Sequence, residues 1–125
     1  MRYLITLKAT HPDGPPPAEL MAAIATLGME ATTSGALLDT AGLAPTFDSS
    51  RITLTSGELS LVDGPFAEAK ELISYAIYQV RDKAEAAEWT MRFMKLHKDL
   101  WPGWDGEAEI SRVFGPDDFA PPQPG

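Results

Sequence analysis

The chain of 125 residues contains no cysteine, only two histidines, and fewer basic than acidic side chains. Without cysteine it can form no disulfide framework, has no thiol chemistry and offers no thiolate to a metal. Ten Lys and Arg against eighteen Asp and Glu give a formal charge of −8, which repels phosphate backbones and anionic lipid. We therefore expect neither nucleic acid nor a membrane surface as a partner.

Long hydrophobic runs are also missing. No apolar stretch approaches the roughly 20 residues that span a bilayer, and the N-terminus lacks the basic and apolar regions of a signal peptide. These absences predict a cytoplasmic protein. His11 and His97 are too far apart for a metal-ligand motif, and there is no Gly-rich phosphate loop or nucleophile elbow, so we predict neither metal nor cofactor.

The residues that are present describe one globular domain with a tail. Hydrophobic residues make up 44% of the chain, and its length suits a single domain. We assign residues 1–115 to this domain and residues 116–125, four of which are proline, to a tail. Because Phe119 is the large apolar side chain of the tail, two interpretations stay open: a solvated end, and a lid anchored by Phe119 on a partner.

Local patterns predict alternating strands and helices. Tyr3, Ile5 and Leu7 recur at every second position, which is typical of a strand with one buried face. Apolar residues at three- and four-residue spacing predict helices, the second with Asp82 as its N-cap. The predicted strands are 1–10, 35–45, 51–55, 59–62, 72–80 and 107–114, and the predicted helices are 18–30 and 84–101.

This order predicts an α+β fold, a ferredoxin-like split βαβ arrangement with an added central β-hairpin. The strand over 72–80 is apolar on both faces, so it needs cover on both sides of the sheet. Two helices cover one face only. The uncovered face therefore predicts a symmetric homodimer in which two sheets enclose a shared interior.

Three side chains are candidates for proton transfer. Asp63 either caps a turn in which Gly64 takes an unusual backbone angle, or presents a carboxylate at the mouth of the shared interior. His97 is either a packing histidine or a general base, since imidazole titrates near neutrality. Asp39 faces either solvent or the interior. The candidate substrate-binding residues are Tyr75, Gln79 and Trp101.

The string Asp63-Gly-Pro-Phe66, followed by Lys70-Glu71, resembles the DGPF signature of the YCII-related family. The order of the surrounding strings is similar over roughly residues 1–114, from Arg2-Tyr-Leu-Ile5 to Trp101-Pro-Gly103. The resemblance implies a dimeric α/β barrel of ferredoxin-like protomers. Its superfamily includes small cofactor-free isomerases and monooxygenases, and DGPF members often accompany extracytoplasmic-function sigma factors.

Two departures limit what the resemblance implies for individual residues. The first predicted helix has no histidine, so the family's proposed His–Asp pair is not carried over, and the strand lacks a Gly expected before Tyr75. Two hypotheses of function follow. The first is a cofactor-independent lyase, isomerase or oxygenase acting on a small organic molecule in the dimer barrel through His97, Asp39 or Asp63. The second is a non-catalytic binding or regulatory module associated with a sigma-factor system.

Overall fold

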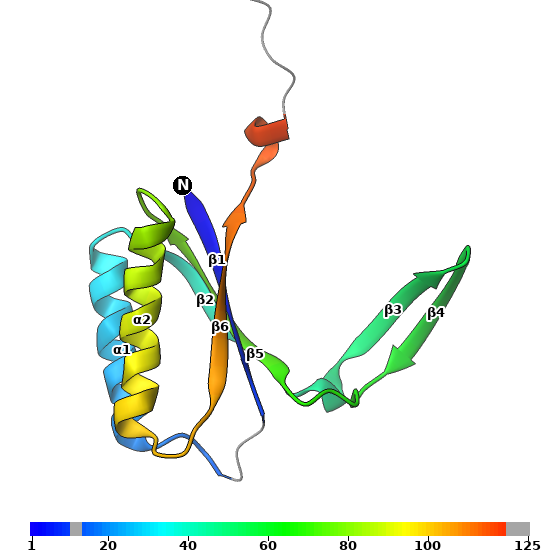
Figure 1. The fold of residues 1–125 in the computed structure, drawn as a ribbon, viewed down its shortest axis with the longest axis horizontal. Coiled ribbons are helices and arrows are strands. Elements are labelled where there is room, and N and C mark those ends of the chain that lie inside the picture. The colour runs from blue at the N-terminus through cyan, green and yellow to red at the C-terminus, as the bar shows by residue number, and fades with distance from the viewer. Residues whose placement is uncertain (11–13, 120–125) are drawn as a thin grey trace, which may run out of the picture.

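The computed structural model describes residues 1–10 and 14–119, which form a four-stranded sheet, two helices and a separate hairpin (Figure 1). The elements are β1 (Arg2–Ala9), α1 (Ala18–Thr33), β2 (Leu37–Gly42), a 3₁₀ turn (Thr46–Asp48), β3 (Ser50–Thr55), β4 (Glu58–Asp63), β5 (Glu71–Gln79), α2 (Lys83–Leu100), β6 (Gly106–Val113) and a second 3₁₀ turn (Pro116–Phe119).

The sheet has the strand order β2-β5-β1-β6, and every neighbouring pair is antiparallel. Helices α1 and α2 lie side by side on one face of it, and no helix of the described residues covers the other face (Figure 1). Each helix connects two strands of the sheet that are not neighbours. The predicted α+β, ferredoxin-like arrangement with an inserted hairpin is therefore confirmed.

The core lies between the sheet and the helices. Tyr3, Ile5 and Leu7 alternate in β1 and are buried on the helix side, as their spacing predicts. Tyr78 of β5 lies beside Tyr3 and stacks on Trp89 of α2, with 6.1 Å between ring centroids. Strand β5 is an inner strand of the sheet, between β2 and β1.

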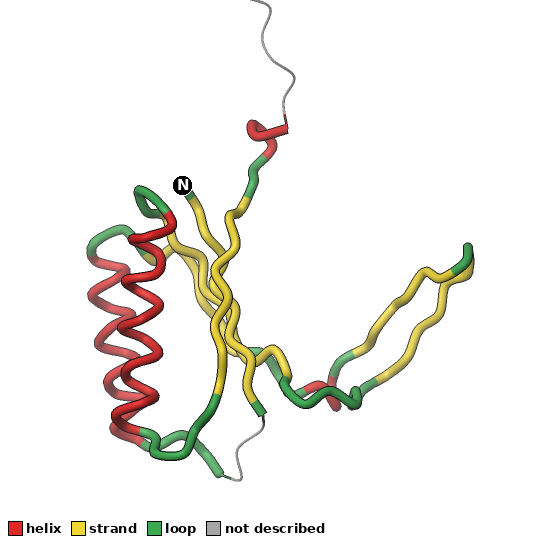
Figure 2. The backbone as a smooth tube through the Cα atoms, viewed as in Figure 1, coloured by secondary structure: helices red, strands yellow, loops and turns green. Residues whose placement is uncertain are grey.

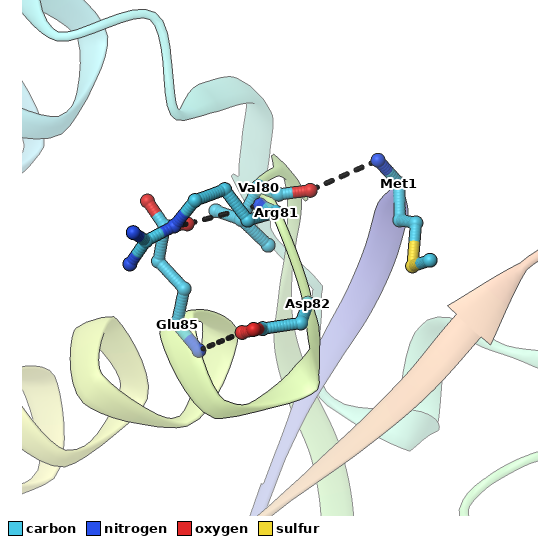
Figure 3. A network of polar contacts seen from close by, with 5 residues as sticks. All are labelled: Met1, Val80, Arg81, Asp82 and Glu85. Atoms are coloured by element: carbon cyan, nitrogen blue, oxygen red, sulfur yellow. Dashed lines mark hydrogen bonds and ion pairs between the residues drawn. The ribbon is translucent and has the colours of Figure 1, made fainter.

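The start of α2 is held by a cap that the sequence predicts (Figure 3). The side chain of Asp82 accepts a hydrogen bond from the Glu85 backbone N–H at 2.9 Å, which satisfies a donor that the first turn leaves unpaired. Glu85 is also paired with Arg81, at 2.8 Å. The amino group of Met1 donates to the Val80 carbonyl at 2.9 Å, so the N-terminus is fixed beside the same corner.

Two element ends differ from their prediction. Helix α1 continues to Thr33 rather than ending at Glu30, because Ala31 extends its buried stripe and Gly35, with a φ of 83°, follows the last turn. Strand β2 covers Leu37–Gly42 instead of 35–45, because the chain leaves the sheet before Pro45 and forms a 3₁₀ turn.

The predicted hairpin is confirmed as β3 and β4, which pair from Ser50 with Asp63 to Thr55 with Glu58. Its two-residue turn is Ser56-Gly57, with φ values of 52° and 80°, as the tight connection of two twisted strands requires. The hairpin does not join the sheet. It extends from the body on the side opposite the helices (Figures 1 and 2).

Of the predicted tail, the structure describes only the 3₁₀ turn. Residues 120–125 and His11 lie outside the described residues, so the two interpretations of the tail stay open. Within the part of the chain that the structure describes, no helix is both long and apolar enough to cross a membrane.

Candidate functional site

The last turns of α2 place His97 between the helices and the sheet. The side chain is buried, with 5% of its surface exposed, and its Nδ1 lies 3.0 Å from the Phe93 carbonyl oxygen. A carbonyl oxygen can only accept, so Nδ1 carries the hydrogen and donates it. In the neutral ring this leaves Nε2 as an unprotonated acceptor. Within the described residues, the bond to Phe93 is the ring's only hydrogen bond.

Burial also determines the charge of this ring. It lowers the pKa of His97 below the ordinary 6.5, because the imidazolium would lose its hydration, and the hydrogen bond to the Phe93 carbonyl opposes this effect in part. No charged side chain contributes to the shift. His97 is therefore neutral at pH 7, which suits a proton acceptor and not a proton donor.

Aromatic rings surround His97. The Phe93 ring meets it edge-on with centroids 4.7 Å apart, and the Trp104 ring lies 4.5 Å away at a tilt. Trp101 stacks on Trp104, with centroids 6.1 Å apart. Trp104 needs a glycine beneath it, since a Cβ at Gly106 would lie 2.3 Å from the indole ring. The loop after α2 therefore closes over the histidine.

These side chains line a cavity of about 440 Å³, called here the aromatic cavity. Its volume is within the usual range of small-molecule sites. The remaining wall is mostly apolar, with Thr40 and Ser74 as the other polar side chains. The lining residues are Leu7, Pro16, Leu20, Met21, Ile24, Thr40, Ala41, Gly42, Ile73, Ser74, Phe93, His97, Trp101 and Trp104.

A second cavity, of about 240 Å³, continues from the first toward the middle of the helices. Both cavities are lined by Leu7, Ile24, Thr40, Ser74 and Phe93, so they adjoin at these residues. The hydroxyl of Thr40 donates to the Tyr75 carbonyl at 2.8 Å and is thereby occupied. A ligand in the two cavities would meet a largely apolar wall, on which His97 lines the aromatic cavity and the hydroxyl residues Ser74, Tyr78 and Thr90 line the second cavity.

The other candidates lie on the opposite face of the sheet. The hydroxyl of Tyr75 donates to the Asp39 carboxylate at 3.1 Å, and this bond, with the negative charge of Asp39, raises the pKa of Tyr75. Gln79 is exposed on the same face of β5. Tyr75 also lines the cavity of about 240 Å³, but its hydroxyl lies with Asp39 across the sheet from His97 and Trp101. The aromatic cavity therefore contains His97 and Trp101 but not Asp39, Tyr75 or Gln79.

Asp63 lies at a third place, the base of the hairpin. Its carboxylate accepts a hydrogen bond from the Ser50 hydroxyl at 2.7 Å, across the hairpin. Gly64 does not have the left-handed backbone angle expected of it. It is required instead because a Cβ at this position would lie 1.7 Å from the Thr46 carbonyl oxygen. The peptide bond between Gly64 and Pro65 is cis.

The sequence analysis, which placed His97 between Phe93 and Trp101 on the apolar side of the helix, missed Trp104 as a neighbour of the candidate base. The four-residue spacing from Phe93 to His97 was visible, and Trp104 follows Trp101 by three residues, so the pattern could have indicated an aromatic cluster at the end of the helix. Among the described residues, no three histidine, aspartate or glutamate side chains gather as a metal ion would need.

Comparison with known proteins supports one assignment. No curated protein matches the chain. The family model of the YCII-related domain matches residues 1–99, which include both helices except the last residue of α2, the hairpin and the Asp63-Gly-Pro-Phe66 string. This match covers most of the 125 residues, and the chain therefore belongs to the YCII-related family.

Proposed function

We propose that this protein binds a small, largely apolar organic molecule in the aromatic cavity and that His97 accepts a proton from it without a cofactor. The observation that carries the proposal is the ring of His97, whose Nδ1–H is held by the Phe93 carbonyl while burial keeps the imidazole neutral. A ligand C–H or O–H next to Nε2 would transfer its proton there, leaving a ligand anion and an imidazolium. Return of the proton to another ligand atom would complete an isomerisation.

A second candidate function is non-catalytic binding, with the cavity recognising a small signal molecule. It is favoured by the absence of a charged group among the causes of the His97 pKa shift. Among the described residues that line the aromatic cavity there is no charged side chain to stabilise the imidazolium, which lowers the basicity of the ring. In this case Nε2 accepts a hydrogen bond from the ligand but does not remove its proton.

The binding step is tested with two probes of the same size, 2-naphthol and 2-methylnaphthalene, titrated against tryptophan fluorescence. A hydrogen bond from the naphthol hydroxyl to Nε2 is worth about 0.5–1.5 kcal/mol, so we expect 2-naphthol to bind roughly 2- to 10-fold more tightly. His97→Phe keeps an aromatic ring and removes the acceptor, and it should abolish this preference. Equal preference in both proteins would contradict the assignment of Nε2.

The catalytic step needs its own measurement. We expect the protein to accelerate the exchange of α-hydrogens of 2-tetralone for deuterium from D₂O, followed by mass spectrometry, and His97→Phe to lose this acceleration. Retention of the naphthol preference without any acceleration would favour the non-catalytic alternative.

A further inference from the structure

The second cavity is large enough for a substantial part of a ligand. Its volume is about 240 Å³, whereas an apolar cavity of about 150 Å³ already binds benzene. It adjoins the aromatic cavity at the five residues that line both, which include Leu7 of the sheet and Phe93 of α2. One molecule can therefore extend from His97 into the space between the middle of the helices and the sheet.

Two small residues on opposite walls leave this space open. Ala76 of β5 lies between Ser74 and Tyr78 on the helix side of the sheet and lines the second cavity. Gly28 lines it from α1, and a Cβ at this position would have no atom of the surrounding structure within 4 Å. Glycine inside a helix is less favourable than alanine. The empty space at Gly28 thus has a cost, which occupation of the cavity by a ligand explains.

Tyr78 brings a hydrogen-bond donor to the second cavity. The residue is only 7% exposed, and its hydroxyl makes no hydrogen bond to another described residue. The hydroxyl of Thr90, by contrast, is occupied, since it donates to the Ala86 carbonyl at 2.8 Å. Burial raises the pKa of Tyr78, and the charge of Arg92 opposes this effect in part, so the hydroxyl keeps its proton at pH 7. A ligand oxygen in the second cavity would give this donor an acceptor.

The walls also determine the charge that a ligand can carry. Among the described residues, no charged side chain lines either cavity, and His97 is neutral. A carboxylate or an ammonium group would lose its hydration here without gaining an ion-pair partner. Both cavities therefore favour an uncharged ligand.

We infer that the second cavity holds the tail of the ligand whose head lies beside His97, so that the ligand is an elongated, uncharged molecule with an acceptor oxygen in its tail for the Tyr78 hydroxyl. The inference rests on the proposed function for the position of the head. The apolar part of the tail contributes affinity through burial, and the bond to Tyr78 fixes its orientation.

The length of the ligand is tested with 6-methyl-2-naphthol and 6-butyl-2-naphthol, titrated by calorimetry. Ala76→Leu fills the second cavity from the sheet, where a side chain stands roughly perpendicular to the strand, and Gly28→Leu fills it from α1. Ala22→Leu is the control, because Ala22 is exposed on α1 and lines neither cavity. Circular dichroism checks that all three variants remain folded.

We expect the unchanged protein and Ala22→Leu to bind the butyl probe roughly 10- to 50-fold more tightly than the methyl probe, since each buried methylene contributes roughly 4-fold. Ala76→Leu and Gly28→Leu should lose most of this preference and still bind the methyl probe. Equal binding of both probes by the unchanged protein, or a full preference in both filled variants, would overturn the inference.

His97→Phe separates this inference from the proposed function. The preference for butyl over methyl should persist in this variant, because the tail lies in the other cavity. A wrong assignment of His97 changes only the comparison of 2-naphthol with 2-methylnaphthalene, whereas a wrong assignment of the tail changes only the preference for butyl.

The chemistry of the tail has its own probes. Three ketones carry a carbonyl at each methylene of the butyl chain in turn, and at least one should bind roughly 2- to 10-fold more tightly than the hydrocarbon. Tyr78→Phe keeps the ring that stacks on Trp89 and should abolish this gain. A terminal carboxylate on the butyl chain should weaken binding roughly 10-fold or more. A gain that survives in Tyr78→Phe, or a carboxylate that binds as tightly as the hydrocarbon, would refute the assigned chemistry.

Discussion

Replacing Gly64 by alanine is the sharpest test of how the base of the β3–β4 hairpin is built. The added Cβ would lie 1.7 Å from the Thr46 carbonyl oxygen and 2.8 Å from the carbonyl carbon, whereas Cβ atoms essentially never approach a heavy atom within 3.0 Å. The two backbone segments must therefore separate by more than about 1 Å. Side-chain rotation cannot relieve this clash, because the obstructing atoms belong to the backbone.

The cost follows from the contacts that such a separation breaks. The Gly64 N–H donates to the Ser49 carbonyl at 2.7 Å, and the Ser49 N–H donates to the Thr46 carbonyl at 3.0 Å. Losing these two bonds costs about 1 kcal/mol each, and the displaced backbone adds roughly 1–3 kcal/mol. We expect Gly64→Ala to lower the free energy of unfolding by about 3–5 kcal/mol.

Thermal and urea denaturation measure this loss against two controls. Asp63→Asn keeps an oxygen that accepts from the Ser50 hydroxyl, and it should cost under about 1 kcal/mol. Gly28→Ala makes the same substitution inside α1, where no atom lies within 4 Å of the new Cβ, and it should stabilise by about 0.5–1 kcal/mol. If Gly64→Ala and Asp63→Asn lower the free energy of unfolding by the same amount, the close approach of the Thr46 carbonyl is not the reason that position 64 requires glycine.

Two further predictions concern α2. Burial lowers the pKa of His97 in the folded protein below its value of about 6.5 in the unfolded chain. Between these two pKa values the unfolded chain binds more protons than the folded protein. The free energy of unfolding should therefore fall as the pH drops below about 6.5, and His97 should not affect it above that pH. Urea titrations between about pH 5.5 and 7.5 in a His11→Gln background should show this slope, and its persistence in His97→Phe would refute the assignment. Asp82→Ala removes the acceptor for the Glu85 N–H and should lower the free energy of unfolding by about 1 kcal/mol in the same assay. Asp82→Asn keeps a capping oxygen and is the control. If both variants lose the same stability, the cap contributes little.

The elements with a strong hydrophobic period were predictable from the sequence. Alternation in β1 identifies the buried side of the strand, and the Asp82 cap locates the first turn of α2 within one residue. The two apolar faces of the strand over 72–80 indicated that it needs cover on both sides of the sheet, but its place in the strand order was not predicted. The local register was harder to predict: pairing with β1 shifts at Ile73, which is skipped between Leu72 and Ser74. This bulge lies where the resemblance led us to expect an additional Gly.

The position of the β3–β4 hairpin and the existence of the aromatic cavity could not be predicted from hydrophobic periodicity. Alternation of Ile52 and Leu54 indicates a strand with an apolar face, but a local period carries no information about which body covers that face. The cavity depends on contacts between α2 and the loop that follows it, where Trp104 lies over Gly106. Such contacts are tertiary, and His97 therefore remained ambiguous between packing and chemistry.

The signature string and the candidate base lie at different places, and β5 connects the segment that follows the string to the cavity that His97 lines. The Asp63-Gly-Pro-Phe66 string forms the base of the β3–β4 hairpin, and the residues that follow it lead into β5. Glu71 at the start of β5 accepts a hydrogen bond from the Thr46 hydroxyl, on the segment that packs against Gly64. Ile73 and Ser74, two and three residues further, line the aromatic cavity. The base of the hairpin and the wall of the aromatic cavity are therefore connected through β5.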